Sequence, residues 1–265
     1  MASRKQQRTP SHMALWSTTW TVDDKPLQVD LGNLTLIAVR HSHEWRLNYR
    51  WQEREDNGGF AVGHRSDLSD NAEPGSAIDR IAMETMTGTL KLRPSLADRP
   101  VVVRPYSPLT IPGRNKITLY VSTPLWLQVE FSERVKHELP SHQLSDTWMG
   151  ALTGQGELCY GSHTHARLNR DLLPDQPFRA VSPITIHNKG SEDCTLERLS
   201  IPAPFLSLFA LDEQLVTEPL SIAMDAEKQE GVVQIGKLAD AELVTRPRKA
   251  SDRGILVNAW ENLFA

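Results

Sequence analysis

The chain has 265 residues and a formal net charge of −4 at pH 7, with 39% hydrophobic and 23% charged residues. This length and composition predict a folded globular protein and exclude a chain that is disordered throughout. The acidic balance argues against nucleic-acid binding, because Lys and Arg contacts to phosphates supply most of that affinity. We interpret the local basic clusters at 4–8 and 246–253 as a solvated tail and a solvated loop.

Cysteine usage and hydropathy predict the compartment. Cys159 and Cys194 are too few to hold a chain of this length together by disulfides, which favours a reducing environment. The basic N-terminus is not followed by the apolar stretch of a secretory signal. The most apolar segment, 201–211, has about half the length needed to span a bilayer, and Pro202 and Pro204 interrupt it. We expect a cytoplasmic protein without direct membrane insertion.

Residues 1–13 are polar and basic and predict a flexible tail. From residue 14 onward, short segments alternate apolar and polar residues, as half-buried β-strands do. The segment 43–52 places Trp45, Tyr49 and Trp51 on one face, which we interpret as a core face and not as a stacking platform. The other predicted strands are 34–40, 81–85, 89–93, 101–104, 117–122, 125–131, 181–188, 195–201, 205–211, 231–235 and 255–260.

Turn residues gather between these strands. Residues 53–79 are rich in Asp, Asn, Gly and Ser and are predicted to be the least structured stretch. A second polar break, 136–146, allows a division into two lobes. The turn at 188–191 predicts a hairpin between 181–188 and 195–201.

Helical periodicity is short wherever it occurs. Only 223–230 and 238–244 are predicted to form a helical turn or two. Residues 14–265 are therefore expected to form an all-β, antiparallel, sandwich-like unit with little helix, either single or divided into two packed lobes. The absence of alternating βαβ patterns excludes doubly wound nucleotide-binding folds.

A series of motifs runs through residues 100–209. The motifs are Pro100-Val101-Val102-Val103-Arg104-Pro105, Leu119-Tyr120-Val121-Ser122-Thr123-Pro124-Leu125-Trp126, Trp148-Met149-Gly150, Gly156-Glu157-Leu158-Cys159-Tyr160, Ala166-Arg167, Arg179-Ala180-Val181-Ser182-Pro183, Ile186-His187-Asn188 and Ile201-Pro202-Ala203-Pro204-Phe205-Leu206-Ser207-Leu208-Phe209. Together they resemble the uncharacterised prokaryotic family called domain of unknown function 432, over nearly the whole chain after about residue 14.

The family has no established activity, so the resemblance implies no reaction. Its members are soluble prokaryotic proteins that are often encoded beside small-conductance mechanosensitive channels. The resemblance therefore implies an accessory or regulatory role, with such a channel or another membrane-associated complex as partner.

Two His-x-His pairs, His41 with His43 and His163 with His165, are the candidates for a metal site. On a strand, residues i and i+2 point the same way and lie about 6.6 Å apart, so two imidazoles can bind one ion. No third ligand can be identified, and we expect no cofactor. A metal-dependent enzyme using His163 and His165 is kept as an alternative.

Three charged residues of the motif series, Glu157, Arg167 and Arg179, are the candidates for a ligand site. Held together, they would bind a small anion or form an internal salt-bridge network, and the network is the commoner outcome. We expect any pocket near them. Cys159 has no histidine within reach along a strand, which favours a buried structural thiol.

The sequence contains no phosphate-binding loop, no Gly-x-Ser-x-Gly elbow and no helical zinc-protease motif. The leading hypothesis is a binding or accessory module that is not an enzyme. The alternatives are the metal-dependent enzyme and a carbohydrate-binding module that uses exposed tryptophans. The chain contains seven tryptophans in total.

Overall fold

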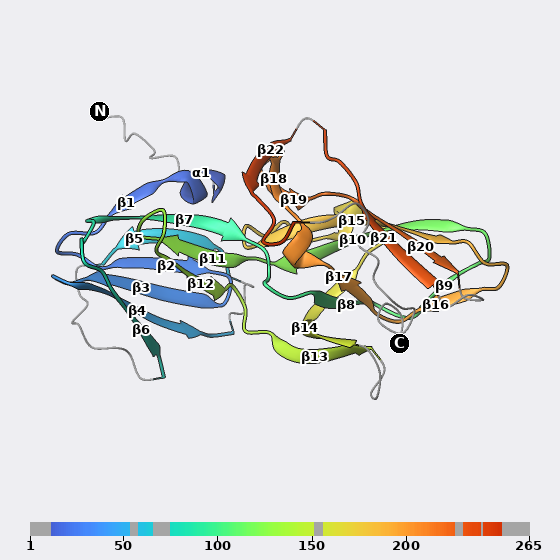
Figure 1. Ribbon diagram of the computed structural model, residues 1–265, viewed down its shortest axis with the longest axis horizontal. Coiled ribbons are helices and arrows are strands. Elements are labelled where there is room, and N and C mark those ends of the chain that lie inside the picture. Colours follow the sequence, from blue (N-terminus) through green and yellow to red (C-terminus); the bar gives the residue numbers. More distant parts are fainter. Residues whose placement is uncertain are drawn as a thin grey trace, which may run out of the picture. The chain divides into compact units, whose positions relative to one another are not determined.

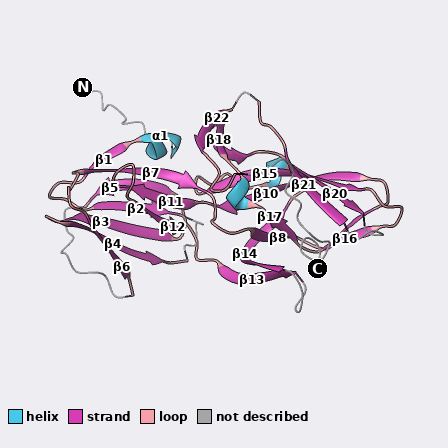
Figure 2. Ribbon diagram, in the orientation of Figure 1, coloured by secondary structure: helices cyan, strands magenta, loops and turns pink. Residues whose placement is uncertain are grey.

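The computed structural model describes residues 12–53, 58–65, 75–150, 156–225, 230–239 and 241–250. Most of their regular structure is β-strand, as Figure 2 shows, which confirms the all-β prediction. The helical elements are α1 (His12–Ser17) and two short 3-10 helices, Arg170–Leu172 and Ala203–Phe205. None of the helices in these ranges has the length and apolar character needed to cross a membrane.

The chain folds into two compact units, which are described separately. Unit 1 consists of Met1–Arg93 and Gln128–Glu138, and unit 2 of Pro94–Leu127 and Leu139–Ala265. The prediction for residues 14–265, a β-rich unit that is either single or divided into two lobes near 136–146, stays a prediction. Of the predicted tail, residues 1–11 lie outside the described residues, and His12 and Met13 begin helix α1.

Three strands contain the points at which the chain passes from one unit to the other. They are β7 (Thr89–Ser95), β11 (Trp126–Glu130) and β12 (Lys136–Pro140). The segment 136–146, predicted to be a polar break, therefore begins with a strand. Residues 60–64 also form a strand, within the stretch predicted to be the least structured.

Unit 1 consists of two sheets with a common core (Figure 1). The sheets have the orders β5-β2-β3-β4-β6 and β1-β7-β11-β12. The strands not yet given are β1 (Thr19–Thr21), β2 (Leu27–Leu31), β3 (Leu34–Arg40), β4 (Glu44–Trp51), β5 (Phe60–His64) and β6 (Ala77–Ala82). Trp45 on β4 is fully buried, and its ring centroid lies 5.1 Å from that of Phe131, which follows β11. The core-face interpretation is thereby confirmed for Trp45, whereas Tyr49 and Trp51 are only half-buried.

A polar contact also joins the two sheets of unit 1. His137 on β12 places Nε2 3.0 Å from Oδ2 of Asp79 on β6. Burial, together with a hydrogen bond to Asp79, raises the pKa of Tyr49 to about 12. Asp79 therefore holds an imidazole and a phenol at the margin of the core.

Unit 2 is built on an antiparallel ladder between β10 (Lys116–Pro124) and β15 (Arg179–Asn188). Every second residue of β15 is buried, so the alternation predicted from sequence sets the inner face. The other edge of β15 pairs in parallel with β19 (Gln214–Thr217) and β20 (Leu220–Asp225). The sheet is completed by β18 (Leu208–Leu211), β21 (Glu230–Ile235) and β22 (Glu242–Thr245).

A second sheet of unit 2 has the order β13-β14-β8-β17. Its strands are β8 (Val101–Pro105), β13 (Ser145–Gly150), β14 (Gly156–Ala166) and β17 (Leu199–Ile201). Strand β14 runs parallel to β8, so the sheets of unit 2 are mixed. A separate pair consists of β9 (Leu109–Ile111) and β16 (Cys194–Leu196).

Several local predictions were wrong. The segments 223–230 and 238–244 were predicted to be helical, but their described parts contribute to β20, β21 and β22. The predicted hairpin across 188–191 does not form, because β16 pairs with β9 and not with β15. The predicted strand 255–260 lies outside the described residues.

Two adjacent glycines give a stability test for unit 1. Gly58 has φ +70°, and a Cβ atom there would lie 2.2 Å from the carbonyl oxygen of Gly32. We expect Gly58→Ala to lower the free energy of unfolding by about 2–4 kcal/mol, because backbone strain and a backbone clash act together. A Cβ atom at Gly59 has no atom within 4 Å, so Gly59→Ala should change the free energy of unfolding by less than about 1 kcal/mol. Urea unfolding of both variants checks this, and equal losses would contradict it.

Candidate functional site

A surface pocket of about 510 Å³ lies in unit 2, where two turns come together. One turn, 106–108, connects β8 to β9, and the other, 197–198, connects β16 to β17. The lining residues are Arg104, Pro105, Tyr106, Ser107, Pro108, Glu197 and Arg198. We call this site the arginine pocket.

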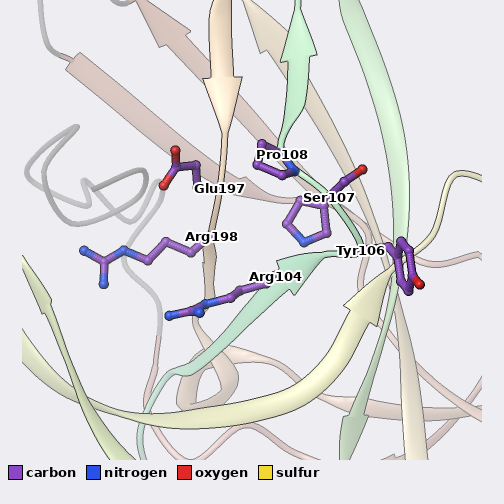
Figure 3. Close-up of a pocket in the computed structure, with 7 residues that line it drawn as sticks. Arg104, Tyr106, Ser107, Pro108, Glu197 and Arg198 are labelled. Atoms are coloured by element: carbon purple, nitrogen blue, oxygen red, sulfur yellow. The ribbon is translucent and has the colours of Figure 1, made fainter.

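Strand register brings the two arginines of the pocket together. In the antiparallel pair of β8 and β17, Val103 lies opposite Leu199. The next position on each strand, one residue beyond this ladder, is Arg104 and Arg198. Residues opposite each other in an antiparallel pair point to the same face and have Cβ atoms about 5 Å apart. Figure 3 shows both side chains extending to the same side of the pocket.

The charges of the arginine pocket are unbalanced. Arg104 is exposed, Arg198 is half-buried and Glu197 is exposed. In the described part of the chain, Arg104 forms no ion pair. With two guanidinium groups and one carboxylate in its lining, the pocket has a net positive charge, which favours a negatively charged ligand.

One predicted ligand residue, Arg167, lies beside the arginine pocket. Its Cζ atom is 5.7 Å from the ring centroid of Tyr106, which is 76% exposed at the opposite side of the pocket. Backbone hydrogen bonds with Tyr120 fix Arg167 at the edge of β10, with N–O distances of 2.7 and 2.9 Å. Arg167 therefore supports the aromatic side of the pocket.

The structure does not bring the other two predicted ligand residues to Arg167. Glu157 lies at the opposite end of β14, exposed but partly desolvated, and this desolvation raises its pKa. Arg179 pairs with Pro124, whereas Tyr120 pairs with Pro183, about 13 Å further along β15. The three charged residues thus occupy separate positions in unit 2, and no single site holds them.

Arg179 is a buried structural cation. Its Nε donates to Ser122 Oγ at 2.8 Å, and a terminal nitrogen donates to the Ser122 carbonyl oxygen at 2.6 Å. Although the residue as a whole is half-buried, its guanidinium is enclosed, and burial lowers its pKa to about 10. Burial, and secondly the charge of Arg179, lower the pKa of His142 to about 4.

The two histidine pairs differ in backbone setting. His41 and His43 lie in the turn between β3 and β4, so the strand geometry assumed for them was wrong. His163 and His165 lie within β14, but their side chains lie outside the described part, and their metal binding stays a prediction. The register of β14 against β8 shifts between Gly161 and His165, so this strand is not regular as assumed. Among the side chains described, no group of three or more His, Cys, Asp or Glu is placed to hold a metal ion.

Cys159 is fully buried, which confirms its structural interpretation. Burial, and secondly the charge of Glu157, raise the pKa of the thiol to about 12. A thiol with this pKa is uncharged at neutral pH and is a poor nucleophile. It packs with Val102 and Met149 between β8, β13 and β14.

Sequence reasoning missed Arg104 and Arg198 as site residues. Arg104 belongs to one of the motifs, Pro100–Pro105, but only as part of a strand. Arg198 lies inside the predicted strand 195–201, which the structure divides into β16 and β17 with Arg198 between them. Their pairing depends on non-local register, for which the sequence has no direct signal.

The fold and the site define an all-β protein with an arginine-lined surface pocket. The chain belongs to the family described as protein of unknown function (DUF432), whose model matches residues 16–264. This confirms the resemblance inferred from the motifs. No curated protein and no solved structure matches the chain.

The low pKa of His142 predicts a pH dependence of stability. As the pH falls from 6.5 towards 4, the unfolded chain takes up a proton on this imidazole that the folded protein does not. We expect this proton uptake to lower the free energy of unfolding by roughly 1–3 kcal/mol. The side chain is partly exposed, so solvent screening limits the effect. His142→Gln should remove this part of the pH dependence in urea unfolding at pH 7 and pH 5. The control His43→Gln changes an exposed residue and should retain the pH dependence of the wild type. An unchanged pH dependence in His142→Gln would refute the assignment to His142.

Proposed function

We propose that this protein is a non-enzymatic binding module that takes a small anionic ligand in the arginine pocket. The observation that supports this most is the register that sets Arg104 opposite Arg198. Two guanidinium groups on one side of a pocket offer charge-assisted donors to a single anion. The ligand class is a carboxylate- or phosphate-bearing small molecule.

The chemistry of the lining residues fits such a ligand. Guanidinium groups bind carboxylate and phosphate oxygens in a bidentate manner, with charge-assisted hydrogen bonds. Ser107 adds a hydroxyl group, and the exposed ring of Tyr106 adds an apolar surface. The volume of about 510 Å³ lies in the range of small-molecule sites.

The lining also favours binding over catalysis. The described residues that line the pocket include no histidine, cysteine or lysine, which are the usual general bases and nucleophiles at neutral pH. Glu197 and Ser107 lie on separate turns. The proposal therefore assigns the pocket to recognition of an anion.

Neutralising either arginine should weaken anion binding. We expect Arg104→Gln and Arg198→Gln each to reduce the affinity for phosphate or citrate at least about tenfold, because each removes a charge-assisted contact. The double variant should lose little more, because either charge alone is insufficient. Isothermal titration calorimetry in a buffer of uncharged components measures this. Arg246→Gln, which changes an exposed arginine outside the pocket, is the charge-matched control.

The same variants should act in the opposite direction on stability without an anion. In anion-free buffer, Arg104→Gln should leave the free energy of unfolding unchanged or raise it by about 0.2–1 kcal/mol, because it relieves like-charge repulsion. Added phosphate should stabilise the wild type and not the variant. Equal stabilisation of both proteins by phosphate would reject the pocket as the binding site.

We further propose that the module serves as a cytoplasmic accessory to a membrane-associated complex, such as a small-conductance mechanosensitive channel. Membership of the family supports this part, and no residue contact contributes to it. Tagged protein should co-purify with such a channel from detergent-solubilised membranes of cells that express both. Failure in several detergents would leave the anion-binding proposal intact and remove the channel from it.

A further inference from the structure

The outer face of the β13–β14 hairpin in unit 2 carries exposed apolar side chains. Trp148 and Leu158 lie directly opposite each other in the antiparallel register. They are 42% and 45% exposed, although both belong to sheet strands. The next pair on the same face is Asp146 and Tyr160.

The indole of Trp148 is held flat against the strand. A Cβ atom at Gly156 would lie 2.5 Å from Cζ2 and 2.6 Å from Cε2 of Trp148, so the ring covers this glycine. Glycine is therefore required at 156 for the ring to lie there. One side of the indole rests on the backbone, and the exposed fraction belongs to the remainder. We call Trp148, Gly156, Leu158 and Tyr160 the tryptophan strip.

Polar groups border the tryptophan strip at the Tyr160 end. Arg99 donates to Asp146 Oδ1 at 3.1 Å and lies 5.2 Å from the centroid of the Tyr160 ring. The hydroxyl of Tyr160 donates to Asp98 Oδ1 at 2.9 Å. With two carboxylates, Asp98 and Asp146, and one guanidinium, Arg99, these groups have a net negative charge, so this face attracts no anion.

We propose that the tryptophan strip binds a neutral oligosaccharide, independently of the arginine pocket. An exposed indole matches the apolar face of a pyranose ring, whose hydroxyl groups would then exchange hydrogen bonds with the ion-paired side chains of Arg99, Asp146 and Asp98. Carboxylates and guanidinium groups that are paired with each other still have unused hydrogen-bond acceptors and donors. They can therefore bind the hydroxyl groups of an uncharged ligand.

The dimensions of the strip favour a sugar over a protein partner. Trp148 and Leu158, each less than half exposed, offer only two side chains of apolar surface, whereas a stable protein interface buries about 800 Å² on each partner. From Gly156 to Tyr160 the strand extends about 13 Å. This is room for more than one sugar ring along the hairpin.

The test is binding of short cello-, xylo-, malto- and chito-oligosaccharides to the full chain. Saturation-transfer NMR identifies the class that binds, and calorimetry measures its affinity. We expect one class to bind, and Trp148→Ala to weaken it at least about tenfold through loss of stacking. Gly156→Ala should weaken it as well, because the new Cβ displaces an indole that is still present.

Three further variants separate stacking from general effects. Leu158→Asn, on the neighbouring strand, should cause a smaller loss without removing the indole. Leu243→Asn changes an equally exposed leucine on β22 and should have no effect. Arg104→Gln should weaken anion binding and leave sugar binding unchanged, so the two proposals can fail separately. The proposal would be overturned if no oligosaccharide class bound, or if wild type and Trp148→Ala bound with equal affinity. Binding of a proline-rich peptide to the strip, with no binding of oligosaccharides, would also overturn it.

Discussion

The antiparallel ladder between β10 and β15 is the constraint on which unit 2 depends. It runs from Lys116 opposite His187 to Pro124 opposite Arg179 without a register shift. Because side chains alternate along each strand, this one register decides which residues of β15 enter the core and which face outward. Parallel pairing with β19 and β20 then extends the sheet on the far side of β15. Where the inner face includes polar groups, they bond to each other, as the hydroxyl groups of Ser182 and Thr217 do at 2.8 Å.

The end of this ladder also determines where the arginine pocket forms. Asn188, the last residue of β15, is 1% exposed, and its side-chain amide donates to the carbonyl oxygens of Ile111 and Glu192. These bonds fasten β9 and the segment before β16 to the ladder. The β9–β16 pair in turn leads into the turn at 197–198, and β17 returns antiparallel to β8. Arg198 reaches its place opposite Arg104 through the side-chain bonds of Asn188 and these backbone pairings.

This dependence explains which features could be predicted from the sequence. Alternation alone predicted β3 with its observed bounds, and β4 and β15 to within two residues. Burial alternates strictly along β15, whereas β3 and β4 each contain adjacent buried residues. Alternation does not say which strand is the neighbour. Strand β16 was therefore assigned to β15 across the nearby turn, whereas its partner is β9. The segment 223–230 was interpreted as helical because the alternation of Leu220, Ile222 and Met224, all buried in β20, ends within it. Arg104 and Arg198 could not be combined into one site for the same reason.

Strand β14 separates the two candidate sites of unit 2. Its first half pairs with β13 and presents Leu158 beside Trp148, while just beyond its end Arg167 is bonded to Tyr120 of β10 and lies against Tyr106. A strand in one uninterrupted register with β8 would keep the same pattern of faces along its length. The register shift between Gly161 and His165 removes this restriction and lets the two halves of β14 meet different neighbours. The apolar strip with its acidic border and the cationic pocket can therefore belong to one sheet, although one surface favours a neutral ligand and the other an anion.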